Sequence, residues 1–276
     1  MNHTRQKAGA FALLVLLLPA LGHAQEQSES LDSLLRRTGV KVTEFLDQLA
    51  DVKCSEDVLQ EKLTQKGKTE EKVRSTFEYL VVTQNQGNEP LLYESREAVR
   101  EGHGKKNVSM LVTNGFATQL LVFHPYYQPS FTFDRLPDAH LNGKTYIQVH
   151  FQHIKGRLTP AVLLLRGREY PLSLSGIARI NPATGDVEQV TTELADSMKD
   201  LGLKSYSSQV LYSPVAFQGH AGSYLLPAQA TVEVDTPKQR WRNVHFFTHC
   251  QRFSITVTEQ VHVDKLKEQQ TQKEQQ

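Results

Sequence analysis

The chain has 276 residues, with 31 Lys and Arg against 30 Asp and Glu, so its formal net charge is +1. This balance argues against nucleic acid as a partner, because binding to the phosphate backbone needs a surplus of basic residues on one face. The length suits one large β-rich domain or two small ones. No Pro/Gly/Ser-rich linker divides the middle of the chain, so we expect one domain.

Residues 1–24 have the three parts of an export signal. Arg5 and Lys7 form a positive start, an apolar stretch follows at 11–20, and small residues flank position 23. The apolar stretch is too short to cross a bilayer, which argues against the alternative of a retained membrane anchor. We therefore predict export to the periplasm or outside the cell, cleavage after Ala24, and no transmembrane segment in the mature protein.

The first predicted element after the signal is an amphipathic helix, with Ser30 or Asp32 as its N-cap and Gly39 as a possible interruption. Its apolar positions recur at helical spacing, which predicts one face against a core. These positions are Leu31, Leu34, Leu35, Val42, Phe45, Leu46 and Leu49.

From residue 52 the hydrophobic period changes from helical to two, which is typical of strands. Asn142-Gly143 is the strongest hairpin signal, and the alternation at Ile147, Val149 and Phe151 turns one strand face toward a core. We predict an α+β, mainly β fold: one antiparallel sheet that curls, with helices on its concave face. The predicted strands cover 52–65, 77–82, 91–99, 130–136, 144–154, 167–174, 205–214, 225–234 and 241–257, besides a hairpin at 176–190.

Residues 105–123 interrupt this series with helical spacing of apolar residues, ending before His124-Pro125 because the residue before proline resists helical geometry. We expect a second helix, inserted between strands, that covers the concave face or forms a mobile lid over it. At the other end, residues 264–276 consist almost entirely of Lys, Glu and Gln and cannot bury enough apolar surface to order. The predicted domain is therefore 25–263, followed by a disordered polar tail.

No catalytic or metal-binding motif stands out. His150 and His153 are expected on opposite faces of a strand, whereas His245 and His249 share a face but lie too far apart to hold one ion. Ser173 and Ser175 lack the strand-to-helix turn of a serine hydrolase. Asp186 and Glu188 flank a turn and look solvated. We expect no enzyme activity, metal or cofactor; a hydrolase assembled from scattered acids and histidines is the least favoured reading.

Three further features leave alternatives open. The apolar run at 161–165 is either a strand buried on both faces or an exposed apolar loop. Trp241, between two arginines, either stacks on a ligand or closes one end of the core, and the second is favoured. Cys54 and Cys250 either pair, as two thiols in an oxidising compartment often do, or stay separate, and the sequence slightly favours the pair.

The segment 176–190 predicts a hairpin, with Gly185 and Pro182 in its turn and β-branched residues on both sides. Its phrase GIARINPATGDV resembles the strand–turn–strand G-x-x-W/x-I-D-P-x-T-G-x-V of bacterial periplasmic proteins similar to the outer-membrane lipoprotein carrier (LolA/LolB-like) and to RseB. Asn181 replaces the usual Asp, and Arg179 stands at the usual aromatic position. Residues 226–232, LPAQATV, resemble a phrase shared by exported bacterial proteins of unassigned function.

The resemblance implies a curved antiparallel half-barrel whose concave, helix-lidded side binds acyl chains, without catalytic residues. The leading hypothesis is thus a periplasmic, non-enzymatic protein that binds lipid or lipoprotein acyl chains under the 105–123 helix. The alternative is an envelope scaffold or regulatory interaction module with a filled core, leaving its edges and the Trp241 region for another envelope protein. Candidate residues of the acyl cavity are Leu111, Phe116, Leu120, Phe123, Ile147, Val149, Phe151 and Leu211.

Overall fold

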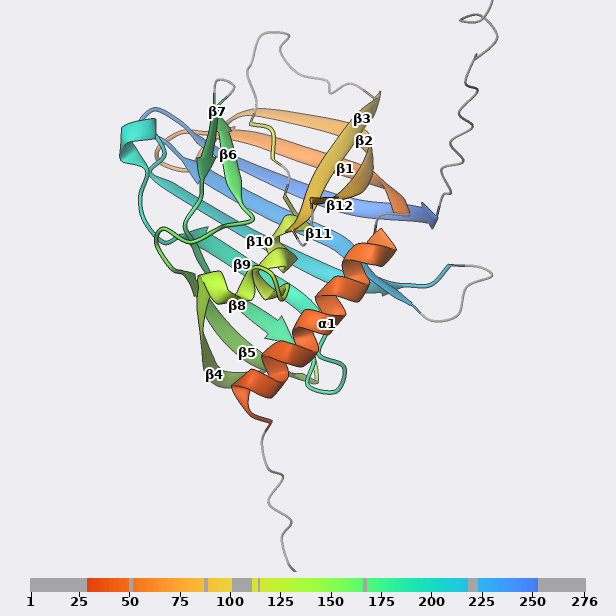
Figure 1. Cartoon of the computed structure of the whole chain (residues 1–276). Helices are drawn as coiled ribbons and strands as arrows, with labels where there is room; N and C mark the ends of the chain where they lie inside the picture. The colour runs from red at the N-terminus through yellow and green to blue at the C-terminus, as the bar shows by residue number, and fades with distance from the viewer. Residues whose placement is uncertain are drawn as a thin grey trace, which may run out of the picture.

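A ten-stranded antiparallel sheet forms the body of the computed structural model (Figure 1). The structure describes residues 29–49, 52–86, 89–100, 111–113, 115–165, 168–217 and 223–252. The strand order is β3-β2-β1-β12-β11-β10-β9-β8-β5-β4, and β6 and β7 form a separate pair. The elements are α1 (Leu31–Leu49), β1 (Val52–Leu63), β2 (Thr69–Gln86), β3 (Glu89–Arg100), η1 (Thr118–Phe123), η2 (Gln128–Ser130), β4 (Phe131–Leu141), β5 (Lys144–His153), β6 (Val162–Leu165), β7 (Arg168–Pro171), β8 (Leu174–Ile180), β9 (Val187–Leu194), η3 (Lys199–Leu201), β10 (Ser205–Val215), β11 (Tyr224–Asp235) and β12 (Arg240–Arg252).

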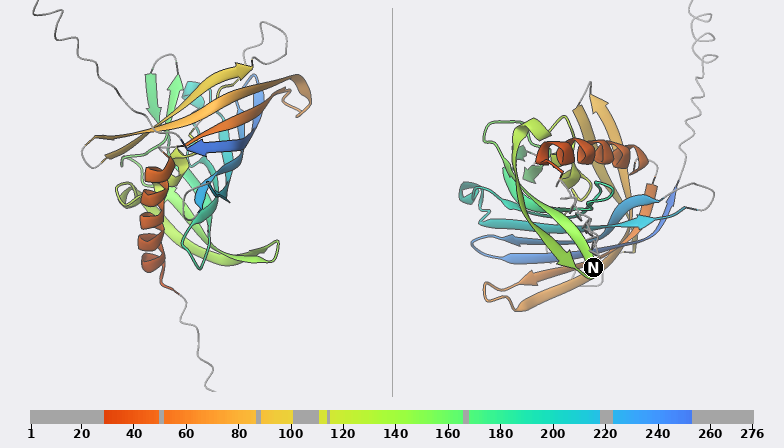
Figure 2. Two further views of the ribbon diagram at one scale, coloured as in Figure 1. Left: turned by 90° about the vertical axis from the view of Figure 1, so that its right-hand side faces the viewer. Right: turned by 90° about the horizontal axis from the view of Figure 1, so that it is seen from below.

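The sheet is curved and open, and α1 lies across one of its faces (Figure 2). Its continuity depends on the pairing of β1 with β12, in which Leu59 lies opposite Val244. The first and last strands of the described chain are therefore neighbours in one continuous sheet. The predicted fold class, a curved antiparallel sheet with an N-terminal helix, is confirmed.

The helix α1 is continuous where Gly39 allowed an interruption. Ser30 caps it, since its Oγ accepts the Ser33 N–H at 3.3 Å. A Cβ at Gly39 would lie 3.2 Å from the Phe123 carbonyl oxygen, so this glycine lets the helix approach the chain after η1 closely. Gln128 fixes that approach by donating to the carbonyl oxygens of Leu35, at 2.9 Å, and Phe123, at 2.7 Å.

The hairpin predicted at 176–190 is confirmed as β8 and β9, with Ala178 opposite Val190. Gly185 adopts φ +80°, and its N–H bonds the Asn181 carbonyl at 2.9 Å. Asn181 replaces an aspartate without loss of the turn bond, because its Oδ1 accepts the Ala183 N–H at 2.9 Å. Gly176, in β8, cannot be replaced by a larger residue without a clash, because a Cβ there would lie 2.1 Å from the Thr191 carbonyl oxygen.

The helix predicted over 105–123 is wrong for the part of it that the structure describes; residues 105–110 and 114 lie outside that part. Residues 111–113 have no regular secondary structure, residues 116–117 form a turn, and η1 is a 3₁₀ helix. Gly115 has φ +92°, which breaks a right-handed helix at that point. The apolar spacing reflects a segment buried among its neighbours, with Gln119, Leu120, Leu121, Val122 and Phe123 all buried.

The strand predicted at 167–174 is also wrong, because two elements share these residues. Arg168–Pro171 pairs with Val162–Leu165 in the separate hairpin, and Leu174 then begins β8. Val162 and Leu164 are 50% and 67% exposed, so this apolar run is neither a strand buried on both faces nor a loop; it is an exposed strand.

Several predictions concern residues outside the described ranges: the export signal at 1–24, the tail at 264–276, and residues 253–257 of the last predicted strand. Within the described ranges, no helix has the length and apolar character needed to cross a bilayer.

Candidate functional site: the covered face of the sheet

The predicted cavity residues lie largely in one place. Phe116, Leu120, Phe123, Val149 and Phe151 are all at most 1% exposed, and with Ile147 they belong to one hydrophobic core. This core joins the covered face of the sheet to α1 and to the segment 115–131. Leu111 and Leu211 are half-buried and are not members of it; Leu211 alternates along β10 with Val210 and Tyr212, whose side chains are buried in the core.

Aromatic side chains fill the space between cover and sheet. Phe123 lies edge-on to Phe151 with ring centroids 5.8 Å apart, and Phe45 of α1 meets Tyr212 in the same way at 5.9 Å. Gln119 of η1 donates to the Ser208 hydroxyl at 2.6 Å, and the Tyr212 hydroxyl donates to the Phe116 carbonyl at 2.5 Å. The covering segment is thus held by side-chain packing and a few polar contacts, and not by strand pairing.

A pocket of about 140 Å³ opens at the edge of this cover. It is smaller than the roughly 300–1,000 Å³ of pockets that hold drug-sized ligands. Its wall is part polar and comes from α1, η1 and the ends of β9–β11. The lining residues are Lys41, Val42, Glu44, Phe45, Gln48, Leu120, Asp186, Val187, Pro214, Ser223 and Leu225.

A chain of buried polar groups, which we call the latch, ties residues 111–113 to β1, β3 and β12. Its members are Glu56, Arg96, Thr113, Asn243 and His245. Glu56 is 0% exposed and His245 1% exposed. Arg96 holds the Glu56 carboxylate with two donors, one bond measuring 2.8 Å, and Arg96 Nη1 donates to the Thr113 carbonyl at 2.5 Å. This bidentate pair is the strong form of an ion pair.

The donor and the acceptor of each hydrogen bond within the latch can be assigned from the chemistry of the side chains. Glu56 can only accept when ionised, so His245 Nδ1–H donates to it at 2.8 Å. His245 Nε2 then accepts from the Thr113 hydroxyl at 2.7 Å, and that hydroxyl accepts from the Asn243 amide at 3.0 Å. With His245 neutral, each of these hydrogen bonds joins a donor to an acceptor.

The electrostatics agree with this assignment. Burial acts to raise the pKa of Glu56, but hydrogen bonds from His245 and Arg96 outweigh it, and the pKa of this carboxyl lies below its ordinary value. Burial lowers the pKa of His245, and the attraction of Glu56 does not restore it. An ionised Glu56 beside a neutral His245 is therefore the stable arrangement at neutral pH.

The turn after the latch is fixed by Glu94. Its carboxylate accepts the N–H groups of Gly115 at 2.7 Å and Ala117 at 2.9 Å. These are the backbone donors at the start of the 3₁₀ segment, which have no carbonyl partners of their own. Glu94 and Arg96 both come from β3, so this strand orders the backbone on both sides of residue 114.

Thr113, His245 and Glu56 follow the order of a hydroxyl–histidine–carboxylate triad. Here, however, the carboxylate is already neutralised by Arg96, and the hydroxyl also accepts a bond from Asn243. The pocket of 140 Å³ touches none of the three. The arrangement accounts for the burial of polar groups without any reaction, and we interpret it as structural.

Latch residues were missed by the sequence reading, although β1 carries a usable signal. Val52, Cys54 and Val58 mark the buried face of that strand, and Glu56 lies in the same register. A carboxylate on a buried strand face needs a paired charge. Nothing local to the sequence identifies Arg96 or His245 as its partners.

The histidine pairs behave differently from each other. His153 is buried and bonds the Ser173 hydroxyl at 3.3 Å, while His150 is half-buried, in line with opposite faces. The shared face expected for His245 and His249 is wrong, because a register shift in β12 and a φ of +50° at His249 turn the second ring outward. In the ranges that the structure describes, no cluster of His, Cys, Asp and Glu is suited to a metal.

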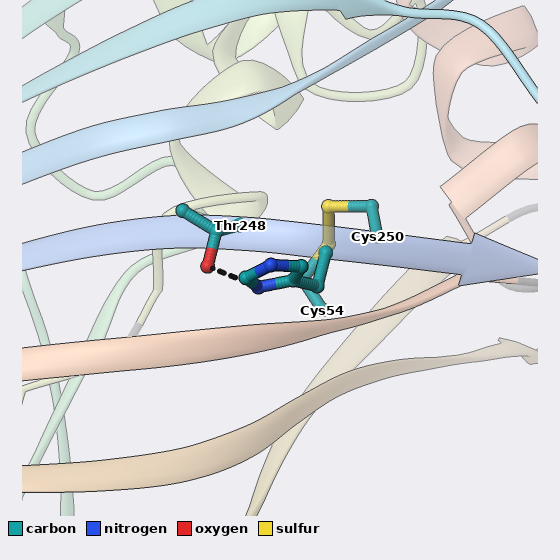
Figure 3. Close-up of a disulfide and its surroundings, with 4 residues drawn as sticks. Cys54, Thr248 and Cys250 are labelled. Carbon is teal, nitrogen blue, oxygen red and sulfur yellow. Dashed lines mark hydrogen bonds between the residues drawn. A yellow bond between two sulfur atoms is a disulfide. The ribbon is translucent and has the colours of Figure 1, made fainter.

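The structure pairs Cys54 with Cys250 across β1 and β12, beside this bulge (Figure 3). The bonded cysteines are 196 residues apart in sequence. Figure 3 shows Thr248 beside the disulfide, and the Thr248 hydroxyl oxygen lies 3.0 Å from Nδ1 of His249. The bond therefore links the first and last strands close to where the described chain ends.

Trp241 is not among the described residues that form the hydrophobic core or pack against it. Trp241 is half-buried, and its neighbours Arg240 and Arg242 pair with Glu233 and Glu61.

Glu188, expected to be solvated, retains 18% side-chain exposure and accepts from Asn181 at 2.8 Å and Tyr146 at 3.0 Å. That expectation is wrong for Glu188, because the β8–β9 turn folds Asn181 back onto it.

No protein-family model matches the sequence, and no curated protein matches it. Among solved structures, it is similar to a DUF1329 family protein from Desulfovibrio piger, with 10% identity, 85% of this chain and 98% of that chain covered, and a TM-score of 0.42. It is also similar to a candidate outer membrane lipoprotein-sorting protein domain from Vibrio parahaemolyticus, with 9% identity, 83% of this chain and 98% of that chain covered, and a TM-score of 0.40. For the Mycobacterium tuberculosis lipoprotein LppX, the identity is 9%, 83% of this chain and 100% of that chain are covered, and the TM-score is 0.20. Similarities of this size extend no family, ligand or activity to this chain.

Proposed function

We propose that the protein is a non-enzymatic binding protein of the bacterial envelope, and that its ligand is a lipid or lipoprotein acyl chain. The proposed site is the apolar face of the sheet under residues 115–123. In the structure this face is covered, so binding requires the segment to move away from Val149 and Phe151.

The observation that carries the proposal is the way the cover is attached. A largely apolar sheet face, which also carries the buried polar groups of Thr192 and Ser208, is closed by a segment without strand pairing. The polar attachments of this segment lie at Thr113, Gly115 and Ala117 before η1 and at Gln119 within it. Displacing such a segment breaks side-chain contacts and leaves the ten-stranded sheet intact. Apolar surface uncovered in this way would bind an acyl chain in place of Phe116, Leu120 and Phe123.

A second candidate function follows from the small pocket. If the interior stays filled, the protein acts as an envelope scaffold or regulatory module that binds another protein through its outer surface. The observation in its favour is the close aromatic packing of the core, where the described pocket has a volume of about 140 Å³.

Lipid extraction and a binding assay separate the two. Protein purified under mild conditions should yield bound lipid by mass spectrometry, and a fluorescent fatty-acid probe should be displaced by that lipid. Leu120→Trp, which adds volume at a 1% exposed position, should weaken probe binding. A matched control is Val40→Trp on the exposed side of α1, where the side chain is 56% exposed. Absence of both lipid and probe binding rejects acyl binding and favours the scaffold.

A further inference from the structure

The hairpin of β6 and β7 is an apolar surface that the core does not use. Leu158, Val162 and Leu164 are 58%, 50% and 67% exposed, although side chains of this kind are normally buried. Val162 and Leu164 lie on β6 of the separate two-stranded sheet, whereas Leu158 lies in the connection between β5 and β6. Figure 1 and the left view of Figure 2 show this pair standing away from the large sheet.

The base of the hairpin is fixed to the fold. His153 Nε2 lies 3.2 Å from the carbonyl oxygens of both Arg157 and Leu158, and the Leu172 N–H bonds the Ala161 carbonyl at 2.9 Å. The Thr159 hydroxyl also donates to the Leu172 carbonyl at 2.9 Å. The hairpin that carries Val162 and Leu164 is therefore fixed at its base by hydrogen bonds.

The segment that carries these side chains has a surplus of basic residues, although Glu169 lies directly opposite Leu164 and Arg168 lies opposite Leu165. Lys155, Arg157 and Arg168 are exposed, and Glu169 is the one acid among the described residues of 154–172. Within the described part of the chain none of the three basic groups forms an ion pair, whereas many other surface lysines and arginines do. The whole chain carries a net charge of only +1, so this local surplus is distinctive.

We propose that this hairpin docks on the surface of an anionic phospholipid bilayer. Exposed aliphatic side chains flanked by Lys and Arg fit the interface of such a membrane, where the apolar groups enter the boundary of the acyl region and the basic groups meet the lipid phosphates. A protein groove could accept the aliphatic groups, but the cluster of unpaired basic residues favours phospholipid. This inference does not depend on acyl binding inside the sheet, since the hairpin is a separate surface.

Co-sedimentation of the purified protein with vesicles tests it. Vesicles of phosphatidylcholine and phosphatidylglycerol at 7:3 should bind the protein, vesicles of pure phosphatidylcholine should bind it at least tenfold more weakly, and 0.5 M NaCl should reduce binding to the anionic vesicles. Lys155→Gln with Arg157→Gln should lower the partition coefficient about 25-fold, at about fivefold per basic residue.

The apolar part is tested by Val162→Asp with Leu164→Asp, which should lower binding to the 7:3 vesicles at least tenfold. Val40→Asp is the matched control, because it changes a 56% exposed valine on α1 and should leave binding unchanged. Circular dichroism and the melting temperature verify that each variant is folded. Failure of the unmodified protein to bind 7:3 vesicles, or equal binding by the hairpin variant, overturns the proposal. Neither result bears on the fatty-acid probe, so the two proposals fail separately.

Discussion

The latch makes a quantitative prediction through Glu56→Gln. The substitution preserves the shape of the side chain and removes its charge, so the Arg96 guanidinium, whose side chain is 12% exposed, loses its counter-ion. His245 Nδ1–H also loses an ionised acceptor. Breaking a buried ion pair by removing one partner costs about 3–5 kcal/mol, because the other charge stays desolvated.

That cost is a large part of the roughly 5–15 kcal/mol that stabilises a typical domain. Urea unfolding of the oxidised protein at pH 7.5, followed by circular dichroism, should show a midpoint shift of the corresponding size. The matched control is Glu97→Gln on β3, where the side chain is exposed; it should change the free energy of unfolding by at most about 0.5 kcal/mol.

A second variant tests the reasoning further. Glu56→Gln combined with Arg96→Met removes both charges, so the double variant should recover part of the lost stability. Two results would refute the view that Glu56 and Arg96 act as one buried pair. One is a loss of less than about 1 kcal/mol in the free energy of unfolding for Glu56→Gln. The other is a double variant that is less stable than Glu56→Gln by as much as an independent destabilising substitution would cost.

Three further predictions concern pH, packing and the disulfide. The pKa of His245 is lowered in the folded state, so the unfolded chain binds a proton more readily than the folded protein. The free energy of unfolding should therefore fall as the pH drops below the unfolded pKa of about 6.5, by at most about 1.4 kcal/mol per pH unit. His245→Gln should reduce this pH dependence in urea titrations at pH 5.5 and 7.5, and an unchanged dependence contradicts the assignment. Gly176→Ala places a methyl group against the Thr191 carbonyl oxygen and should cost about 1–3 kcal/mol by urea unfolding, with full stability as the contrary result. Replacing Cys54 and Cys250 together by serine should cost about 2–5 kcal/mol, and reducing agent should then have no further effect on the melting temperature.

The curved sheet was predictable because its signals are local. Alternating burial, the Asn142-Gly143 turn and the 176–190 hairpin each act over a few residues. Strand ends were harder, as in β2, which runs over Thr69–Gln86 where only 77–82 was predicted. Pairing with β1 and β3 extends that strand through polar residues that lack a clear pattern.

The 105–123 prediction failed because helical spacing and burial on several sides produce the same apolar pattern. The conformation there is decided by Glu94 and Arg96, which bind the backbone of the segment from a strand that precedes it. The apolar run at 161–165 is ambiguous in another way. Apolar residues normally indicate a core, but here Val162 and Leu164 lie exposed on a hairpin.

By itself the sequence determined the class of fold, the helix at Leu31–Leu49 and the framework turn at Gly185, because periodicity and turn chemistry are properties of neighbouring residues. Only the tertiary structure decided what covers the sheet and which charges are paired. Glu56 and His245 are 189 residues apart in sequence and meet because β1 pairs with β12. Long-range strand pairing thus creates both the latch and the disulfide, and no local pattern specifies either.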